Sequence, residues 1–200
     1  MNEALRIGMR HCVAAVIATQ VDGQAVTYSA GFVVGNGVSA TITWNRTDNS
    51  HYGDDVEDAR DNSITSGDIE FTNSGISATA RASLLGDTQV GSTDEYEMSV
   101  EATPAVGFGY MRVIRKNATI VYEAVWLHKV QFSENTINDS TKGEAIEWGE
   151  TTLNGRIMAV KDNASLTPHI MAHQEFSTEA AALAYLQGKA NITTSSGSTT

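Results

Sequence analysis

The chain has 200 residues with 13 basic and 24 acidic side chains, which gives a formal net charge of −11. Tight binding to nucleic acid depends largely on Lys and Arg at phosphates, so this balance disfavours a protein whose task is to hold DNA or RNA. A hydrophobic content of 41% allows one domain with a real core, and no apolar stretch is long enough to predict a transmembrane helix.

The residue types favour a mainly β fold. Thr, Val, Gly, Ser and Asn are frequent, and there are only two prolines. The first residues contain no apolar segment of the kind that a signal peptide has, so we expect no secretion. Cys12 is the one cysteine, which excludes an internal disulfide and fits a reducing cytoplasm. We expect Cys12 to be a small apolar core residue.

The first elements that the pattern predicts are three strands. Residues 13–21 and 24–34 are rich in Val, Ala, Thr and aromatic side chains, and they flank Asp22-Gly23, a strong hairpin signal. A third strand, residues 38–44, follows a Gly-Asn-Gly break. Together they predict an antiparallel start to the sheet.

Residues 45–63 interrupt this pattern with an acidic segment that has almost no apolar side chains. Such a segment cannot bury enough surface to fold alone. We therefore expect a long exposed loop, or a segment that is ordered by a partner. Its acidic residues are Asp48, Asp54, Asp55, Glu57, Asp58 and Asp61.

A strand at residues 68–72 and a short helix at residues 76–85 are expected next. Ile76, Ala80 and Leu84 fall on one helical face, and Gly86 suits a C-terminal cap. The alternation of Ile76, Ala78 and Ala80 also fits a strand, but the helix is favoured.

The second half carries the clearest β pattern. Strands are predicted at residues 96–102 and 107–115, with a turn at 116–119 and an unusually long strand at 120–132. The expected faces of that long strand are Ile120, Tyr122, Ala124, Trp126, His128, Val130 and Phe132 on one side, and Val121, Glu123, Val125, Leu127, Lys129 and Gln131 on the other. The second face is half apolar, which suits a strand that leaves its own sheet to pack against a neighbour. The glycines of Gly107-Phe108-Gly109 indicate a close backbone approach or a bulge within a strand, rather than a phosphate-binding loop.

The end of the chain divides into a polar loop at 135–144, a closing strand pair at 145–160 and a C-terminal extension from 162. Ser177-Thr178-Glu179 predicts the start of a helix that runs through about Gln187, with Gly188 past its end and Leu183 and Leu186 on its buried stripe. Residues 192–200 are expected to be disordered. The first domain is thus predicted to span 1–161 and the extension 162–200.

The histidines are the candidates for catalysis or metal binding. His169 and His173 are spaced as two ligands on one helical face would be, and His51 lies beside Asp54 and Asp55. Pro168 and the missing Glu after His169 weaken the first pattern, and solvated loops commonly look like the second. Nucleophile and phosphate-loop motifs are absent. We expect no enzyme, no metal and no cofactor.

Several motifs, taken in order, resemble the major tail tube proteins of long-tailed bacteriophages. Each motif is weak alone, and the order and spacing over most of residues 1–160 carry the likeness. The segment after Lys161 departs from the shared pattern. The matching motifs are Tyr52-Gly53-Asp54-Asp55, Gly67-Asp68-Ile69-Glu70, Leu84-Leu85-Gly86, Pro104-Ala105-Val106-Gly107-Phe108-Gly109 and Ser140-Thr141-Lys142-Gly143-Glu144.

The resemblance implies a β-sandwich or barrel-like tail tube fold with one flanking helix, here with a C-terminal helix added. It implies rings of six subunits that stack into a tube in the virion tail, assembled in the host cytoplasm. The implied partners are the chain itself and the tail-tip initiator and terminator proteins, with DNA as cargo in the lumen and no membrane. The residues expected at assembly contacts are Tyr52, Asp54, Asp55, Glu57, Asp58, Tyr122, Trp126 and Glu144.

Three other functions fit parts of the sequence. A tube subunit of a contractile-injection or gene-transfer particle shares the same physics. A β-sandwich module that binds carbohydrate or mediates adhesion would need an exposed aromatic patch, which Trp44, Tyr52 and Trp148 can supply. A small metallohydrolase would use His169 and His173.

Overall fold

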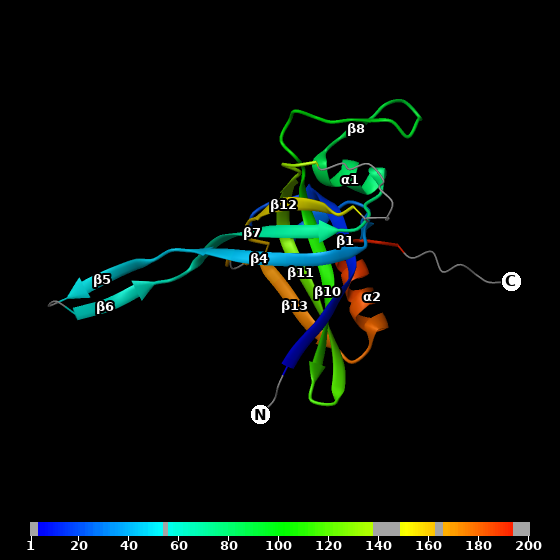
Figure 1. Cartoon of the computed structure of the whole chain (residues 1–200). Coiled ribbons are helices and arrows are strands. Elements are labelled where there is room, and N and C mark those ends of the chain that lie inside the picture. Colours follow the sequence, from blue (N-terminus) through cyan, green and yellow to red (C-terminus); the bar gives the residue numbers. More distant parts are fainter. Residues whose placement is uncertain (1–3, 54–55, 138–148, 163–165, 194–200) are drawn as a thin grey trace.

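The computed structural model describes residues 4–53, 56–137, 149–162 and 166–193, and it has a mainly β fold with two helices (Figure 1). This confirms the fold class that the composition predicts. Neither helix in the described part of the chain is long and apolar enough to cross a membrane. The strands are β1 (Ala4–Thr19), β2 (Thr27–Tyr28), β3 (Phe32–Gly35), β4 (Gly37–Arg46), β5 (Asn49–Gly53), β6 (Val56–Asp61), β7 (Ile64–Asn73), β8 (Thr88–Gln89), β9 (Tyr96–Glu97), β10 (Ala105–Lys116), β11 (Thr119–Ser133), β12 (Thr151–Ile157) and β13 (Met171–Phe176). The helices are α1 (Ala78–Leu85) and α2 (Glu179–Lys189).

The main sheet closes on itself in a barrel-like way. Its antiparallel strands run in the order β1-β10-β11-β12-β7-β4. β4 does not pair with β1, but β3 does, and only Asn36 separates β3 from β4. Gly35 permits the bend between them, because its φ is +127° and a side chain there would meet the carbonyl oxygen of Gly75 at 2.2 Å.

Strand β11 belongs to two parts of the molecule. Its residues 130–133 pair with β12 inside the barrel, whereas residues 122–127 pair with β13. Beyond the barrel, the strands β1, β10, β11 and β13 therefore continue as an open four-stranded sheet. In Figure 1 this open sheet forms the lower part of the body, with the chain's first strand and the turn between β10 and β11 at its end.

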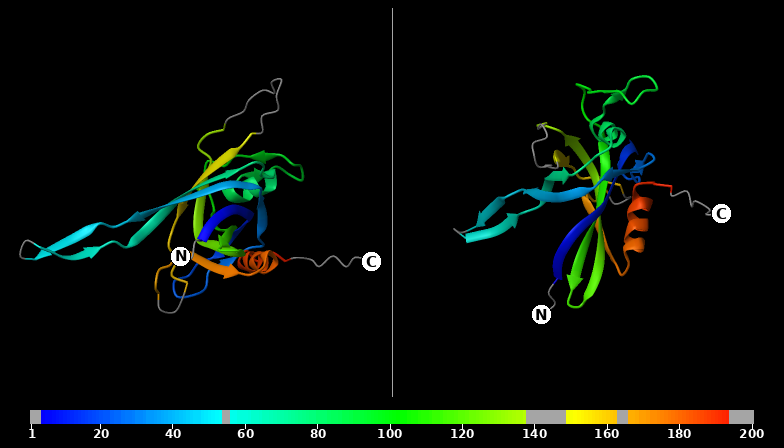
Figure 2. Two further views of the ribbon diagram at one scale, coloured as in Figure 1. Left: turned by 60° about the horizontal axis from the view of Figure 1, so that its bottom comes forward. Right: turned by 45° about the vertical axis from the view of Figure 1, so that its right-hand side comes forward.

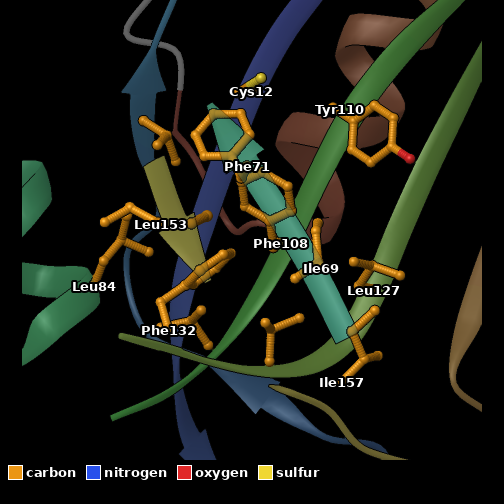
Figure 3. Packing of buried hydrophobic residues seen from close by; sticks show 14 of the residues in the cluster. Cys12, Ile69, Phe71, Leu84, Phe108, Tyr110, Leu127, Phe132, Leu153 and Ile157 are labelled. Atoms are coloured by element: carbon orange, nitrogen blue, oxygen red, sulfur yellow. The ribbon is translucent and has the colours of Figure 1, made fainter. Parts of the chain in front are cut away.

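Aromatic side chains fill the interior of the barrel (Figure 3). The ring of Phe108 packs edge-on against Phe71 at 5.1 Å and against Phe132 at 5.3 Å between centroids. Leu84 of α1 reaches the same cluster. Cys12 is fully buried there, which confirms the core role expected for it, and burial raises the pKa of its thiol to about 12.

A second apolar cluster lies on the outer face of the open sheet, under α2 (Figure 2). Trp126 is fully buried against Leu186, and Tyr28 packs edge-on against the indole at 5.3 Å. The N-terminus of α2 is tied to β1, since His11 and Arg10 both contact the carboxylate of Glu179. Those contacts hold the pKa of Glu179 below its usual value.

The helices agree with the sequence pattern. α1 begins after Ser77, whose side chain accepts a hydrogen bond from the Ala80 N–H, and Gly86 closes it in the left-handed conformation. The helix was therefore the right choice over the strand at residues 76–85. α2 begins after the predicted cap Thr178, but it runs through Gly188 to Lys189 instead of ending near Gln187.

Most of the predicted strands are present, but their bounds differ, and the strand predicted at 24–34 is divided into β2 and β3 with residues 29–31 between them. β1 starts nine residues earlier than the predicted strand at 13–21, and it pairs with β2 across a longer connection than the two-residue turn expected at Asp22-Gly23. The strand predicted at 96–102 is only the two residues of β9. The described part of 145–160 holds one long strand, β12, rather than a pair. β13 was not predicted at all.

The face alternation of β11 was predicted correctly only as far as Leu127. Between the pairs Phe108–Leu127 and Val106–Val130, β11 advances by three residues while β10 advances by two. This bulge moves the later residues to the other face. Val130 and Phe132 consequently share the barrel interior with Leu127, although the simple alternation assigned them to the face of Trp126.

The close packing of aromatic rings against Gly107 gives a stability test. A Cβ on Gly107 would meet the Trp126 ring at 2.3 Å and the Tyr28 ring at 2.6 Å, whereas a Cβ on Gly8 would meet nothing within 4 Å. We predict that Gly107→Ala lowers the free energy of unfolding by about 1–3 kcal/mol, because the second core must shift to admit it. Gly8→Ala should stay within about 0.5 kcal/mol of wild type or exceed it. Urea denaturation of both variants compares them, and equal stability would contradict the predicted clash.

Candidate assembly surfaces

A β-ribbon projects from the body, and we call its two strands, β5 and β6, the arm (Figures 1 and 2). The two strands are antiparallel, with Asn49 opposite Asp61 and Tyr52 opposite Glu57. An ion pair of 2.8 Å between Arg60 and Asp48 links them near the base. β5 and β6 make their substantial contacts with each other, so the arm stands away from the core.

The arm corrects the prediction of a long exposed loop, or a segment ordered only by a partner, at 45–63. Strands β4 and β7 pair as far as Arg46 and Ile64, and Thr47 and Ser63 continue the ladder through hydrogen bonds of backbone and side chain. The acidic composition correctly excluded a buried segment. It did not exclude a ribbon, since a two-stranded ladder satisfies its backbone groups without a core.

Three of the residues predicted for assembly, Tyr52, Glu57 and Asp58, fall on the arm. Tyr52 and Glu57 lie on its paired strands, and Asp58 is exposed on β6. Asp54 and Asp55 lie outside the described residues. The described part of this group thus sits on the most protruding element of the molecule (Figure 2).

The open sheet has two strands with unpaired edges. Within the described part of the chain, β13 pairs only with β11. Residues 4–11 of β1 pair only with β10, because β3 and β2 take up the same edge of β1 from Cys12 onward. The two edges bound the same four-stranded sheet on opposite sides. A free edge presents N–H and C=O groups that can pair with another chain.

Apolar side chains are exposed at the outer end of this sheet. Leu5 and Ile7 of β1 are 57% and 56% exposed, and Ile120 of β11 is 45% exposed. Leu5 pairs with Arg115, which in turn pairs with Ile120, so Leu5 and Ile120 lie on one face of three adjacent strands. Exposed apolar groups next to an unpaired edge are typical of a protein contact surface.

The remaining predicted assembly residues lie elsewhere. Trp126 has no exposed surface, because Ala182 and Leu186 of α2 cover it. It therefore acts in the subunit's own core, and its assignment to an assembly contact is corrected. Tyr122 lies partly buried beside the same cluster. Glu144 lies outside the described residues.

Several charged side chains on the face of the open sheet opposite α2 are paired within the chain. Arg112 contacts Glu123 at 3.2 Å and donates to the Tyr110 hydroxyl at 2.8 Å, while Lys116 contacts Glu175 at 2.6 Å. Burial raises the pKa of the Tyr110 phenol. The charges within these pairs offset one another, and Arg6, which lies opposite Ile114 on the same face, adds a positive charge near Tyr110.

The structure separates the histidines that the spacing grouped. His173 lies on β13 and faces Glu123 at 3.2 Å, whereas His169 precedes that strand and contacts Asp162. His169 is instead grouped with Asp162 and His128, a residue of β11 that no local sequence pattern connects to it. His51 is exposed on the arm.

The aromatic residues considered for a sugar-binding patch do not form one in the described part of the chain. Trp44 is partly buried and packs against the barrel core. Tyr52 lies on the arm strand β5, and Trp148 lies outside the described residues. Trp44 thus contributes to packing of the barrel.

Comparison with known proteins assigns no family to this chain. No model of a known protein family matches the sequence, and no curated protein matches it. Function is therefore inferred from the surfaces described above together with the order of the sequence motifs.

The arm is predicted to be dispensable for folding. Replacing residues 48–62 with Asn-Gly would join Thr47 to Ser63 through a two-residue turn that suits an antiparallel ladder. We expect the free energy of unfolding to change by no more than about 1 kcal/mol, because the described strands of the deleted part make their substantial contacts with each other and their ion pair is exposed. Urea denaturation and circular dichroism measure this. A variant that unfolds or loses most of its stability would show that the arm supports the body.

Proposed function

We propose that this chain is a structural subunit of a bacteriophage tail tube, built from stacked rings around a channel for the genome. The observation that carries the proposal is the four-stranded sheet with free edges on β1 and β13. The order of the sequence motifs is the reason for proposing a bacteriophage tail tube in particular. The arm and the exposed apolar end of the sheet support it.

Strand direction favours a closed ring. Along the open sheet β1, β10, β11 and β13 alternate in direction, since each neighbouring pair is antiparallel. With four alternating strands, β13 of one subunit meets β1 of the next in the antiparallel sense when both subunits point the same way. A head-to-tail contact of this kind repeats, and it closes when the rotation between subunits divides a full turn. Closure pairs both free edges of the open sheet.

The arm suits contact between rings. It extends away from the body on strands that continue β4 and β7, so its position is fixed at the base by the barrel (Figure 1). A protruding ribbon that is not needed for the core is free to lie on a neighbouring ring. Its acidic residues, among them the exposed Asp58, would meet basic or polar groups there.

The negative net charge of the subunit is compatible with DNA as the cargo. Each subunit carries −11, and a ring multiplies that charge by its number of subunits. A wall of the same sign as the phosphates holds DNA weakly and allows it to slide. Acidity thus supports a conduit for DNA and opposes a DNA-binding protein.

Related tubes use the same surfaces. A subunit of a contractile-injection or gene-transfer particle would need the same free edges and the same arm. The particle is identified by what surrounds the tube and what passes through it, rather than by the subunit's sheet.

Electron microscopy of the purified chain over a concentration series tests the proposal. We expect rings or tubes with a central hole at high concentration, and for the variant that lacks residues 48–62 we expect at most single rings. If the protein stays monomeric, a preformed tail-tip fraction is added as initiator. A chain that remains monomeric even then, and binds a sugar saturably, would contradict the proposal and favour the carbohydrate-binding module.

The ring contact is tested separately at the β1 edge. Leu5→Lys and Ile7→Lys place a charge at a free edge, which opposes pairing with a second chain. Because both side chains are exposed, we expect the free energy of unfolding to change by less than about 0.5 kcal/mol while rings are lost. Val21→Lys, at another exposed apolar site away from this edge, is the control. Rings formed equally by all three variants would exclude the β1 edge.

A further inference from the structure

Three residues from distant parts of the chain converge beside the start of β13. His128 lies on β11, and its backbone N–H donates to the carbonyl of Ile170. His169 forms an isolated β-bridge with Val160 through two hydrogen bonds, of 2.9 and 3.0 Å. Asp162 follows Val160 by two residues. The backbone pairing therefore fixes the positions of the Cα atoms from which the three side chains extend.

The side-chain atoms of this cluster are close enough to share one ion. One ligand atom from each of His128, Asp162 and His169 lies within 4.8 Å of the other two. His128 Nδ1 is 3.6 Å from an Asp162 carboxylate oxygen, and the other carboxylate oxygen contacts His169 Nε2. Tetrahedral ligands at about 2.0–2.1 Å from Zn²⁺ lie about 3.4 Å from one another. The separation of His128 and Asp162 is near that value, whereas His169 Nε2 and the Asp162 carboxylate are in direct contact and must move apart to admit an ion.

Hydrogen bonding of His169 prepares its Nε2 atom as a ligand. Its Nδ1 lies 3.1 Å from the carbonyl oxygen of Thr167, which can only accept, so Nδ1 must carry a proton. In a neutral ring, Nε2 then presents a lone pair to the carboxylate of Asp162. Two acceptors in direct contact are unfavourable, so either Nε2 is protonated or the two groups move apart around a cation. A backbone carbonyl on Nδ1 with a metal on Nε2 is a common arrangement for a ligating histidine.

His128 is largely buried, with 10% of its side chain exposed, so little solvent competes for its ring nitrogen. A neutral imidazole is the form that binds a metal. Lys189 is the nearby cation that works against an added ion, and its ammonium lies over the Tyr185 ring, 5.5 Å from the centroid.

We propose that His128, Asp162 and His169 bind one divalent transition-metal ion, for which Zn²⁺ has the best chemical fit. Imidazole nitrogen and one carboxylate oxygen are typical Zn²⁺ ligands, whereas Ca²⁺ and Mg²⁺ prefer oxygen alone. Water fills the fourth position, since His128 and Asp162 line a cavity of about 400 Å³. The ion would join the segment after Lys161 to β11. This inference does not depend on the tube function.

The competing arrangement is an ion pair without metal. In that case His169 is an imidazolium that donates to Asp162, and the cluster takes up a proton instead of Zn²⁺. The two arrangements differ in stoichiometric metal binding and in the protonation of Nε2, so they are separable by experiment.

The test is titration of the full-length, untagged protein with Co²⁺ after treatment with a chelator, followed by competition with Zn²⁺. We expect one equivalent of Co²⁺ to bind with the visible spectrum of a four-coordinate ion, Zn²⁺ to displace it, and the thermal unfolding midpoint to rise with Zn²⁺. Asp162→Asn and His169→Gln should weaken binding by at least about tenfold, the loss that even an outer-shell partner can cause. His173→Gln is the matched control, because His173 is a neighbouring histidine outside the cluster.

Two results would overturn the site. The first is the absence of saturable binding, with nitrogen NMR showing both His169 ring nitrogens protonated, which would establish the ion pair. The second is unchanged binding in Asp162→Asn and His169→Gln, or loss in His173→Gln, which would place the ion elsewhere. Circular dichroism of each variant checks that a loss of binding does not reflect unfolding.

Discussion

The rest of the structure depends on how β11 shares its two edges. One edge belongs to β10 along nearly the whole strand, and the other is divided between β13 and β12. Every backbone group of a buried strand needs a partner, so the strand can leave the barrel only if a new strand takes over where β12 ends. β13 is that strand. The bulge between Leu127 and Val130 marks the change, and it allows Trp126 to face α2 while Phe132 faces the barrel interior.

The sequence predicted those parts of the fold that local patterns determine. Ser77 and Gly86 are enough to place α1, and the apolar alternation around Trp126 is enough to predict a long strand. β13 has no such pattern, since its middle residues are His173, Gln174 and Glu175, and it exists because β11 offers an edge. The burial of Trp126 was missed for the same reason. Which face a helix from the far end of the chain covers is a long-range property.

The candidate surfaces were predictable to a similar extent. The acidic composition located the arm and indicated that it stands outside the core, but a composition cannot distinguish a loop from a ribbon whose only partner is itself. The edges of the open sheet were not predictable, because β1 was expected to begin at residue 13 and its first residues include Arg6 and Arg10. Charged residues on edge strands limit indiscriminate pairing. The charged residues that made the β1 edge hard to predict from the sequence are thus also residues that limit aggregation of a free subunit.

Helix α2 links the two free edges of the open sheet. It packs across β1, β10, β11 and β13, and Glu179 ties its first turn to Arg10 and His11 on β1. A helix that spans four strands resists changes in their twist, since its apolar face must stay in contact with all of them. In a ring built through these edges, the twist and curvature of each sheet set the rotation from one subunit to the next. The segment after Lys161, which departs from the tail tube motifs, would therefore help to determine how many subunits close the ring.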